Sequence, residues 1–284
     1  MPVVFISRGT MLGVHMLLDC LRLRGGAPQI SREDLVEIVN SHGEIATRIV
    51  EKLADVTSAY AQFSELRWPY VVLMRHALLD KIRRDNVVYH GYSGHLLVPV
   101  IRHFVRIRID APFAMRVQLT MKRLDCDEDR ARKYIAEVDE QRIQWARFMY
   151  SRDIRNPMLY AFHLNLGQMS TQAACDLIEF IMNDDAFQAT DESRAEVERL
   201  YRSSYIEAAL VSNPATAQFE ISAEAGPEEV RLTGPYLDEA ELEAVKETAL
   251  TAAGPLGISK VEYRFGYENH FDVDLQSEIL EDGA

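Results

Sequence analysis

Apolar residues follow two patterns along the chain. Short apolar-rich segments are typical of strands, longer segments with helical spacing are typical of helices, and the two kinds of segment alternate. Segments typical of strands cover residues 3–8, 86–91, 104–112 and 160–165, and that of residues 86–91 indicates a buried strand. Stripes at helical spacing cover residues 14–21, 32–39, 45–63, 127–150 and 170–180. Strands separated by helices predict an α/β fold with a mainly parallel, doubly wound sheet, and residues 32 to about 84 predict a helical insertion in it.

The first predicted strand passes through a glycine loop directly into the first predicted helix. Gly9 and Gly13 mark this loop, and the order strand, glycine loop, helix is typical of a P-loop domain, where the helix N-terminus binds phosphate. Val14 and His15 follow Gly13 where the pattern has a lysine, and Met16 stands where it has a magnesium-binding Ser or Thr. The sequence therefore favours the fold of such a domain more strongly than its chemistry.

A separate pattern begins near residue 215. Apolar residues alternate over residues 219–223, 230–232 and 261–267, and a helical stripe covers residues 238–252. The order Val230-x-Leu232-x-Gly234, followed by a helix and a strand, resembles the BON domain. This resemblance implies a small α/β domain that recognises a ligand or partner. The alternative is a docking or dimerisation domain without its own ligand, which would make the protein a homo-oligomer.

Charge divides the chain at the same place. From residue 211 onward there are 16 Asp and Glu against 4 Lys and Arg, a balance of −12, whereas the first 210 residues carry 28 acidic and 27 basic residues. We therefore expect two domains, residues 1–210 and residues 211–284, with the boundary near Pro214. An acidic second domain is repelled by nucleic acid and by anionic membranes, which argues against both as partners.

The cysteines and the hydropathy indicate the compartment. Cys20, Cys126 and Cys175 lie far apart without metal-ligand spacing, which argues for a reducing compartment and against a disulfide framework. No leader precedes the first strand, and no apolar run approaches the ~20 residues needed to span a bilayer. We therefore expect a soluble, cytoplasmic protein.

Several short motifs, in order, resemble the cytidylate kinase-like branch of the P-loop nucleoside monophosphate kinases. They are Ile6-Ser7-Arg8, Val87-Val88-Tyr89-His90-Gly91, Ile109-Asp110-Ala111-Pro112 followed by Arg116, Asp139-x-x-Arg142, and residues 160–165. The resemblance covers roughly residues 1–185. It implies a helical lid, ATP and Mg²⁺ as cofactors, and phosphoryl transfer to a nucleoside monophosphate such as CMP. Where this branch has Gly-Arg after the second strand, the chain has Gly91-Tyr92.

The resemblance also implies roles for individual residues. Its lid cations and carboxylate correspond to Arg116, Arg142 and Asp139, which are the candidate catalytic residues. The candidate cofactor-binding residues are Arg8, Gly9, Thr10, Gly13 and Arg147. Each arginine has the alternative of a surface salt bridge, and the spacing of Asp139 and Arg142 also fits a pair within one helix. Asp110 ends a strand where a magnesium-binding carboxylate would lie, or it belongs to an ordinary turn.

Two other clusters allow alternatives. The acidic residues 125–129 fit capping of a helix N-terminus better than a metal site. His90, His95 and His103 fit neither a helical zinc pattern nor a Ser-His hydrolase, so we expect residues 91–94 to form a second loop at the carboxyl edge of the sheet. Two functions follow for the chain, a nucleoside monophosphate kinase or a non-catalytic module that responds to a nucleotide.

Overall fold

The computed structural model describes residues 1–9, 15–40, 45, 47–49 and 64–266. Contacts divide these residues into two units, one formed by residues 1–32 and 84–190 and the other by residues 33–83 and 191–266. Most of the helix predicted over residues 45–63 lies outside the described residues. The second unit contains residues on both sides of residue 210, so contacts group the chain differently from charge, and the predicted domain boundary stays a prediction.

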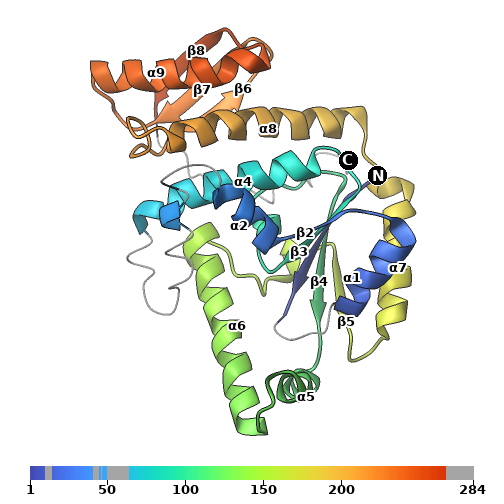
Figure 1. Ribbon diagram of the computed structural model, residues 1–284. Coiled ribbons are helices and arrows are strands. Elements are labelled where there is room, and N and C mark those ends of the chain that lie inside the picture. Colours follow the sequence, from blue (N-terminus) through green and yellow to red (C-terminus); the bar gives the residue numbers. More distant parts are fainter. Residues whose placement is uncertain (10–14, 41–44, 46, 50–63, 267–284) are drawn as a thin grey trace. The chain divides into compact units, whose positions relative to one another are not determined.

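The first unit is built around a five-stranded parallel sheet with the order β2-β3-β1-β4-β5 (Figure 1). The strands are β1 (Val3–Arg8), β2 (Gln29–Ser31), β3 (Val87–Gly91), β4 (Phe104–Asp110) and β5 (Phe162–Asn165). The predicted α/β fold is confirmed, because parallel strands buried between helices appear in the sequence as continuous apolar runs. Only β2, which has three residues, was not predicted.

Helices α1 (His15–Gly25) and α7 (Thr171–Asn183) lie side by side on one face of this sheet (Figure 1). They share a core with the strand side chains that point to that face, such as Val4 and Ile107, and α7 contributes Ile178 to it. These three side chains are at most 1% exposed, and burying an aliphatic side chain contributes about 1.5–3 kcal/mol. This packing fixes α1, the helix that begins just after the predicted loop.

Helices α5 (Phe113–Leu124) and α6 (Glu128–Tyr150) follow β4 and pack against each other. The carboxylate of Asp127 accepts a hydrogen bond of 2.8 Å from the backbone N–H of Arg130 and caps α6. The interpretation of these acidic residues as a helix start is therefore confirmed for Asp127, Glu128 and Asp129, whereas Asp125 ends α5. Among the described residues there is also no group of three or more His, Cys, Asp or Glu side chains that could hold a metal ion.

A disulfide joins α1 to α7, between Cys20 and Cys175, whose Cα atoms are 6.3 Å apart. The expectation of unpaired cysteines is wrong for these two, and the cysteines give no argument for a reducing compartment. The sequence could not indicate this pairing, because 155 positions separate the two cysteines and only the packing of α1 on α7 brings them together. Cys126 is the free cysteine of the described residues.

Reducing this disulfide is expected to destabilise the protein by about 3 kcal/mol, because the bond closes a long loop and restricts the unfolded chain. Urea unfolding with and without a thiol reductant measures the change. The Cys20→Ser, Cys175→Ser double variant should be insensitive to the reductant, and Cys126→Ser should respond as wild type does. Alkylation of all three cysteines in the untreated native protein would show that the bond does not form.

The second unit contains α2 (Arg32–Asn40), α4 (Arg67–Ile82), α8 (Asp191–Ser212) and a small mixed sheet with α9 (Glu239–Ala253). In the sheet, β7 (Glu229–Gly234) pairs antiparallel with β6 (Ser222–Ala225) and parallel with β8 (Lys260–Phe265). The predicted strand, helix, strand order of the tail is confirmed. Helix α8, which was not predicted, contributes Ile206 and Leu210 to the core beneath this sheet.

Glu207 links two neighbours of α8 through a buried carboxylate. Its Oε2 lies 3.5 Å from Nη1 of Arg75 on α4, and its Oε1 accepts a 3.0 Å hydrogen bond from the backbone N–H of Ala223 on β6. The residue is 3% exposed. A buried carboxylate is tolerated only with such partners, because leaving water costs several kcal/mol per ion.

Glu207→Ala is expected to lower the free energy of unfolding by about 3 kcal/mol, since it removes the acceptor of the buried Ala223 N–H and the carboxylate that faces the largely buried guanidinium of Arg75. Glu198→Ala is the matched control on the same helix, because the Glu198 side chain is 51% exposed and lies 3.7 Å from Arg83. That surface pair contributes at most about 1 kcal/mol. Equal losses in chemical denaturation of the two variants would contradict the role given to Glu207.

No helix among the described residues is both long enough and apolar enough to cross a membrane.

Candidate phosphate site at the sheet edge

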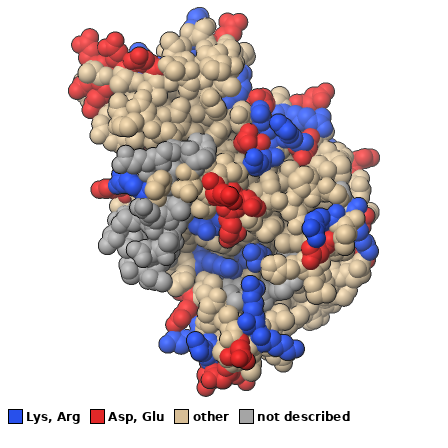
Figure 2. All heavy atoms as spheres, in the orientation of Figure 1, with Lys and Arg blue, Asp and Glu red and all other residues tan. Residues whose placement is uncertain are grey.

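The carboxyl ends of the parallel strands meet at one edge of the sheet in the first unit. Strands β1, β3 and β4 end there at Arg8, Gly91 and Asp110, and ligands of open α/β sheets bind outside this edge. Alternate residues of β4 share one face, and on that face Phe104 gives way to Arg106 and Arg108 toward the edge. Figure 2 shows basic side chains gathered on this face of the molecule between α6 and the strand ends.

Two predicted site residues, Arg8 on β1 and Arg142 on α6, lie together at this edge. Nη1 of Arg142 lies 3.5 Å from the backbone oxygen of Arg8, to which it donates a weak hydrogen bond. Burial lowers the pKa of Arg142, and the positive charge of Arg8 lowers it further. Nε of Arg8 is buried and has no hydrogen-bond partner in the described part of the chain.

Neither of these two guanidinium groups lies within 4 Å of a carboxylate among the described residues. Two partly buried like charges repel each other unless an anion lies between or beside them. The arrangement therefore favours an anionic group such as a phosphate, which arginine can bind in a bidentate manner.

Two other predicted residues, Arg116 and Asp139, neutralise each other. Nη1 of Arg116 on α5 donates a 2.8 Å hydrogen bond to Oδ2 of Asp139 on α6. The intrahelical alternative of Asp139 with Arg142 does not occur as a direct ion pair, because the carboxylate faces α5. In this conformation the pair holds α5 on α6, and it leaves Arg142 as the cation that faces Arg8.

Arg147 lies near the C-terminus of α6, where Nη2 donates a 2.7 Å hydrogen bond to Oδ2 of Asp153. Arg155 bonds to the same carboxylate, and both bonds keep the pKa of Asp153 well below its usual range, against a smaller opposing effect of burial. All three side chains are at least 30% exposed. Arg147 thus belongs to an ion-pair cluster on the surface, which agrees with the alternative of a surface salt bridge.

The glycine loop is described only at its first residue, and Thr10 and Gly13 lie outside the described residues. The backbone N–H of Gly9 donates a 3.2 Å hydrogen bond to the oxygen of Ile109 and so extends the pairing of β1 with β4. In this conformation the amide of Gly9 is used by the sheet. Met16, at the position of the expected hydroxyl, is 71% exposed.

The described residues do not fit a Mg²⁺ site. The carboxylate of Asp110 accepts two hydrogen bonds from Arg108, 2.9 Å from Nε and 3.2 Å from Nη2. Burial opposes the charge of Arg108, but the bonds to Asp110 raise its pKa overall. A carboxylate already paired with a guanidinium is a poor magnesium ligand, and Met16 offers no oxygen. The same edge fits phosphate, because Arg8 and Arg142 are available to it.

A buried polar cluster that the sequence did not indicate lies behind the edge. Oγ of Ser7 donates a 3.0 Å hydrogen bond to the backbone oxygen of Tyr92 and lies 3.3 Å from the hydroxyl of Tyr160. The Tyr160 hydroxyl donates to the oxygen of Ile154 at 2.8 Å, and burial raises the pKa of Tyr160. The signal that could have found this cluster is Ser7 itself, a polar residue at the end of an apolar strand.

His95 packs against this cluster, with its ring centroid 4.9 Å from that of Tyr160. Burial, and next the positive charges of Arg106 and Arg108, lower the pKa of His95 well below its usual value, so the ring is neutral at pH 7. It is 1% exposed, which supports a packing role. The predicted second loop at residues 91–94 is present, with Gly91 ending β3 and Gly94 beginning a 3₁₀ turn.

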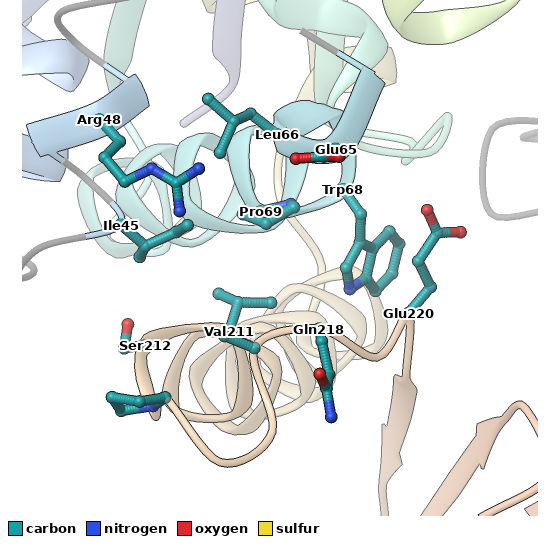
Figure 3. Close-up of a pocket in the computed structure, with 12 residues that line it drawn as sticks. Ile45, Arg48, Glu65, Leu66, Trp68, Pro69, Val211, Ser212, Gln218 and Glu220 are labelled. Atoms are coloured by element: carbon teal, nitrogen blue, oxygen red, sulfur yellow. The ribbon is translucent and has the colours of Figure 1, made fainter. Parts of the chain in front are cut away.

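The second unit has a pocket of about 630 Å³ formed by α4, the end of α8 and the segment that follows it (Figure 3). Its floor is apolar and includes Leu66, Trp68 and Val211, each at most 3% exposed, whereas the exposed rim includes Arg48, Glu65 and Glu220. One arginine and two glutamates give a rim that repels phosphates overall. The sheet edge is therefore the better candidate for a phosphate-bearing ligand.

Comparison with known proteins relates the residues of the sheet edge to a protein family. The model of the cytidylate kinase-like family matches residues 26–168, a segment that includes Arg108, Asp139 and Arg142 and begins after the glycine loop. No curated protein matches the chain.

The fold also occurs in solved structures. A crystal structure of an uncharacterized protein from Eubacterium ventriosum ATCC 27560 superimposes with a TM-score of 0.50 at 16% sequence identity, over 64% of this chain and 98% of that one. A shikimate kinase from Bacteroides thetaiotaomicron gives a TM-score of 0.37 at 10% identity, over 64% of this chain and 99% of that one. The first of these supports the fold alone. Because the family model matches half of the sequence, the chain belongs to the cytidylate kinase-like family.

Proposed function

We propose that the protein binds a nucleotide through its phosphates at the carboxyl edge of the sheet, with Arg8 and Arg142 as the principal cations. The observation that carries the proposal is the contrast among the arginines at this edge. Arg108 and Arg116 are neutralised by carboxylates, whereas Arg8 and Arg142 lie beside each other without one among the described residues. An anion that bridges Arg8 and Arg142 removes their repulsion.

The phosphates of ATP match the two arginines of this site, whereas Mg²⁺ would find no suitable oxygen ligands among its described residues. When bound, ATP would supply a transferable phosphoryl group, and its phosphates would take the place between the two guanidinium groups. Arg8 and Arg142 would bind and orient these phosphates, and Arg142 would neutralise charge that develops on their oxygens. The other cofactor-binding candidates, Thr10 and Gly13, stay part of the proposal as backbone donors.

Phosphoryl transfer from ATP to a nucleoside monophosphate such as CMP is the finer form of this proposal. Family membership supports it. The pairing of Asp110 with Arg108 and of Asp139 with Arg116 disfavours it, since no free carboxylate in the described part of the edge remains to hold a metal ion. We therefore expect transfer to be slow, and nucleotide binding without turnover is the second candidate function.

The small sheet β6-β7-β8 with α9 would have a role in the second candidate function, nucleotide binding without turnover. Its resemblance to the BON domain implies recognition of a ligand or partner, and the matched family model ends at residue 168, so this assignment depends on the sequence alone. In a nucleotide-responsive module, this domain would bind the partner that reads the state of the sheet edge.

A crystal structure with inorganic pyrophosphate tests the proposed site directly. We expect a phosphate group within about 3 Å of a guanidinium nitrogen of both Arg8 and Arg142. Pyrophosphate bound elsewhere on the chain, with the sheet edge free, would refute the assignment.

A further inference from the structure

Tyr92 lies at the same edge, one residue after the end of β3. The guanidinium carbon of Arg142 is 5.3 Å from the centroid of the Tyr92 ring, and that of Arg32, the first residue of α2, is 6.0 Å from it. Both distances are within the range of cation–π attraction, about 6 Å. A single aromatic ring therefore attracts two cations that come from different helices.

The backbone of Tyr92 is held in place independently of its ring. Its oxygen accepts the 3.0 Å hydrogen bond from Ser7, which is 2% exposed. Gly94, two residues further on, packs so closely on Tyr89 that a Cβ at this position would lie 2.3 Å from the Tyr89 ring. The loop is thus fixed by contacts on both sides of Tyr92, so its ring can be changed without releasing the backbone.

The Tyr92 ring lies next to Arg142, a cation whose charged form is disfavoured by its surroundings. Arg142 is partly buried beside Arg8, and both burial and the charge of Arg8 disfavour its charged form. The negative face of an aromatic ring favours a nearby guanidinium, by about 0.5–2 kcal/mol depending on exposure. In the absence of ligand, this attraction opposes the tendency of Arg142 to swing away from Arg8 into water.

We propose that Tyr92 is a positioning residue for phosphate binding, whose ring holds Arg142 against the repulsion of Arg8 so that both cations face an incoming phosphate ester. The inference rests on the proposed function, since it concerns the same site. Tyr92 itself does not bind the phosphate. Its ring reduces the conformational freedom that Arg142 loses when the ligand binds, which strengthens binding without adding a contact.

The test is a calorimetric titration of ATP into wild type, Tyr92→Phe, Tyr92→Leu, Arg142→Gln and the Tyr92→Leu, Arg142→Gln double variant. We expect Tyr92→Phe to retain most of the affinity, because the ring is kept, and Tyr92→Leu to bind about fivefold more weakly. The double variant should bind no more weakly than Arg142→Gln alone, since the ring then has no cation to position. Tyr236→Leu, at a tyrosine that is 80% exposed in the second unit, is the control.

Three results would overturn the inference. They are equal affinity of Tyr92→Leu and Tyr92→Phe, a loss in the double variant equal to the product of the two single losses, and a fivefold loss in Tyr92→Phe itself. Thermal unfolding of each variant separates misfolding from loss of positioning. If Tyr92→Leu does not fold, Tyr92→Met takes its place, and Arg32→Gln, which removes the other cation near the ring, completes the comparison. If wild type does not bind ATP, the proposed function is refuted and the inference with it. If wild type binds ATP but one of the three results above is obtained, only the inference is refuted.

Discussion

Replacing both Arg8 and Arg142 with glutamine is expected to weaken ATP binding by at least about 100-fold. Each guanidinium would make a charge-assisted bond to a phosphate, worth about 1.5–3 kcal/mol, and the two contributions fall on one ligand. Glutamine keeps part of the volume and the hydrogen-bonding capacity of arginine but removes the charge. Calorimetric titration of ATP into wild type and the double variant measures the loss.

The matched control is the Arg22→Gln, Arg132→Gln double variant. It removes the same charge from exposed positions on α1 and α6, where each arginine pairs with a nearby acid on its own helix. Binding within about twofold of wild type is expected there, because exposed pairs contribute little and distant charges are screened by salt. Equal losses in both double variants would mean that net charge, and not the sheet edge, binds the nucleotide.

The second large effect is expected from restoring the usual loop chemistry. Val14→Lys with Met16→Thr should raise the rate of phosphoryl transfer from ATP to CMP by about 10²- to 10³-fold, the gain typical of one well-placed charge donor in a transition state. Met16 is 71% exposed near the start of α1, so threonine fits there without repacking. Val14 lies outside the described residues, and its choice rests on the sequence pattern.

A coupled assay of ADP formation on wild type and this variant gives the answer. Val14→Met with Met16→Thr is the control, since it supplies the hydroxyl without the charge. Fast transfer by wild type would contradict the argument from the altered loop. A variant that binds ATP but gains no rate would favour the non-catalytic nucleotide-responsive module.

The main sheet could be predicted from the sequence because its central strands β1 and β3 are buried on both faces. Strands β1 and β3 follow runs of apolar residues, and β4 and β5 follow apolar residues that alternate with polar ones. Helix α8 could not be predicted as readily, since charged residues interrupt its apolar stripe. Its burial depends on β6, which follows it, and on α4, which lies more than 100 positions earlier in the sequence.

The candidate site shows a different limit. The sequence drew attention to Arg8 and Arg142, which lie together in the structure, but it could not show which carboxylate each arginine meets. The bond between Arg116 and Asp139 joins two helices across 23 positions, and the bond between Arg108 and Asp110 depends on both side chains lying on one face of β4. Pairing across elements is a property of packing, and it decides which cations are available to a ligand.

Calorimetry of the purified protein against ATP, ADP and CMP, each with and without Mg²⁺, tests the central claim most directly. The expected result is saturable binding of ATP and ADP, one per chain, that is displaced by inorganic pyrophosphate and not by adenosine, and that does not require Mg²⁺, because the described edge offers the metal ion no free carboxylate. Absence of saturable binding for all three nucleotides, or displacement by adenosine but not by pyrophosphate, would contradict a phosphate site at Arg8 and Arg142.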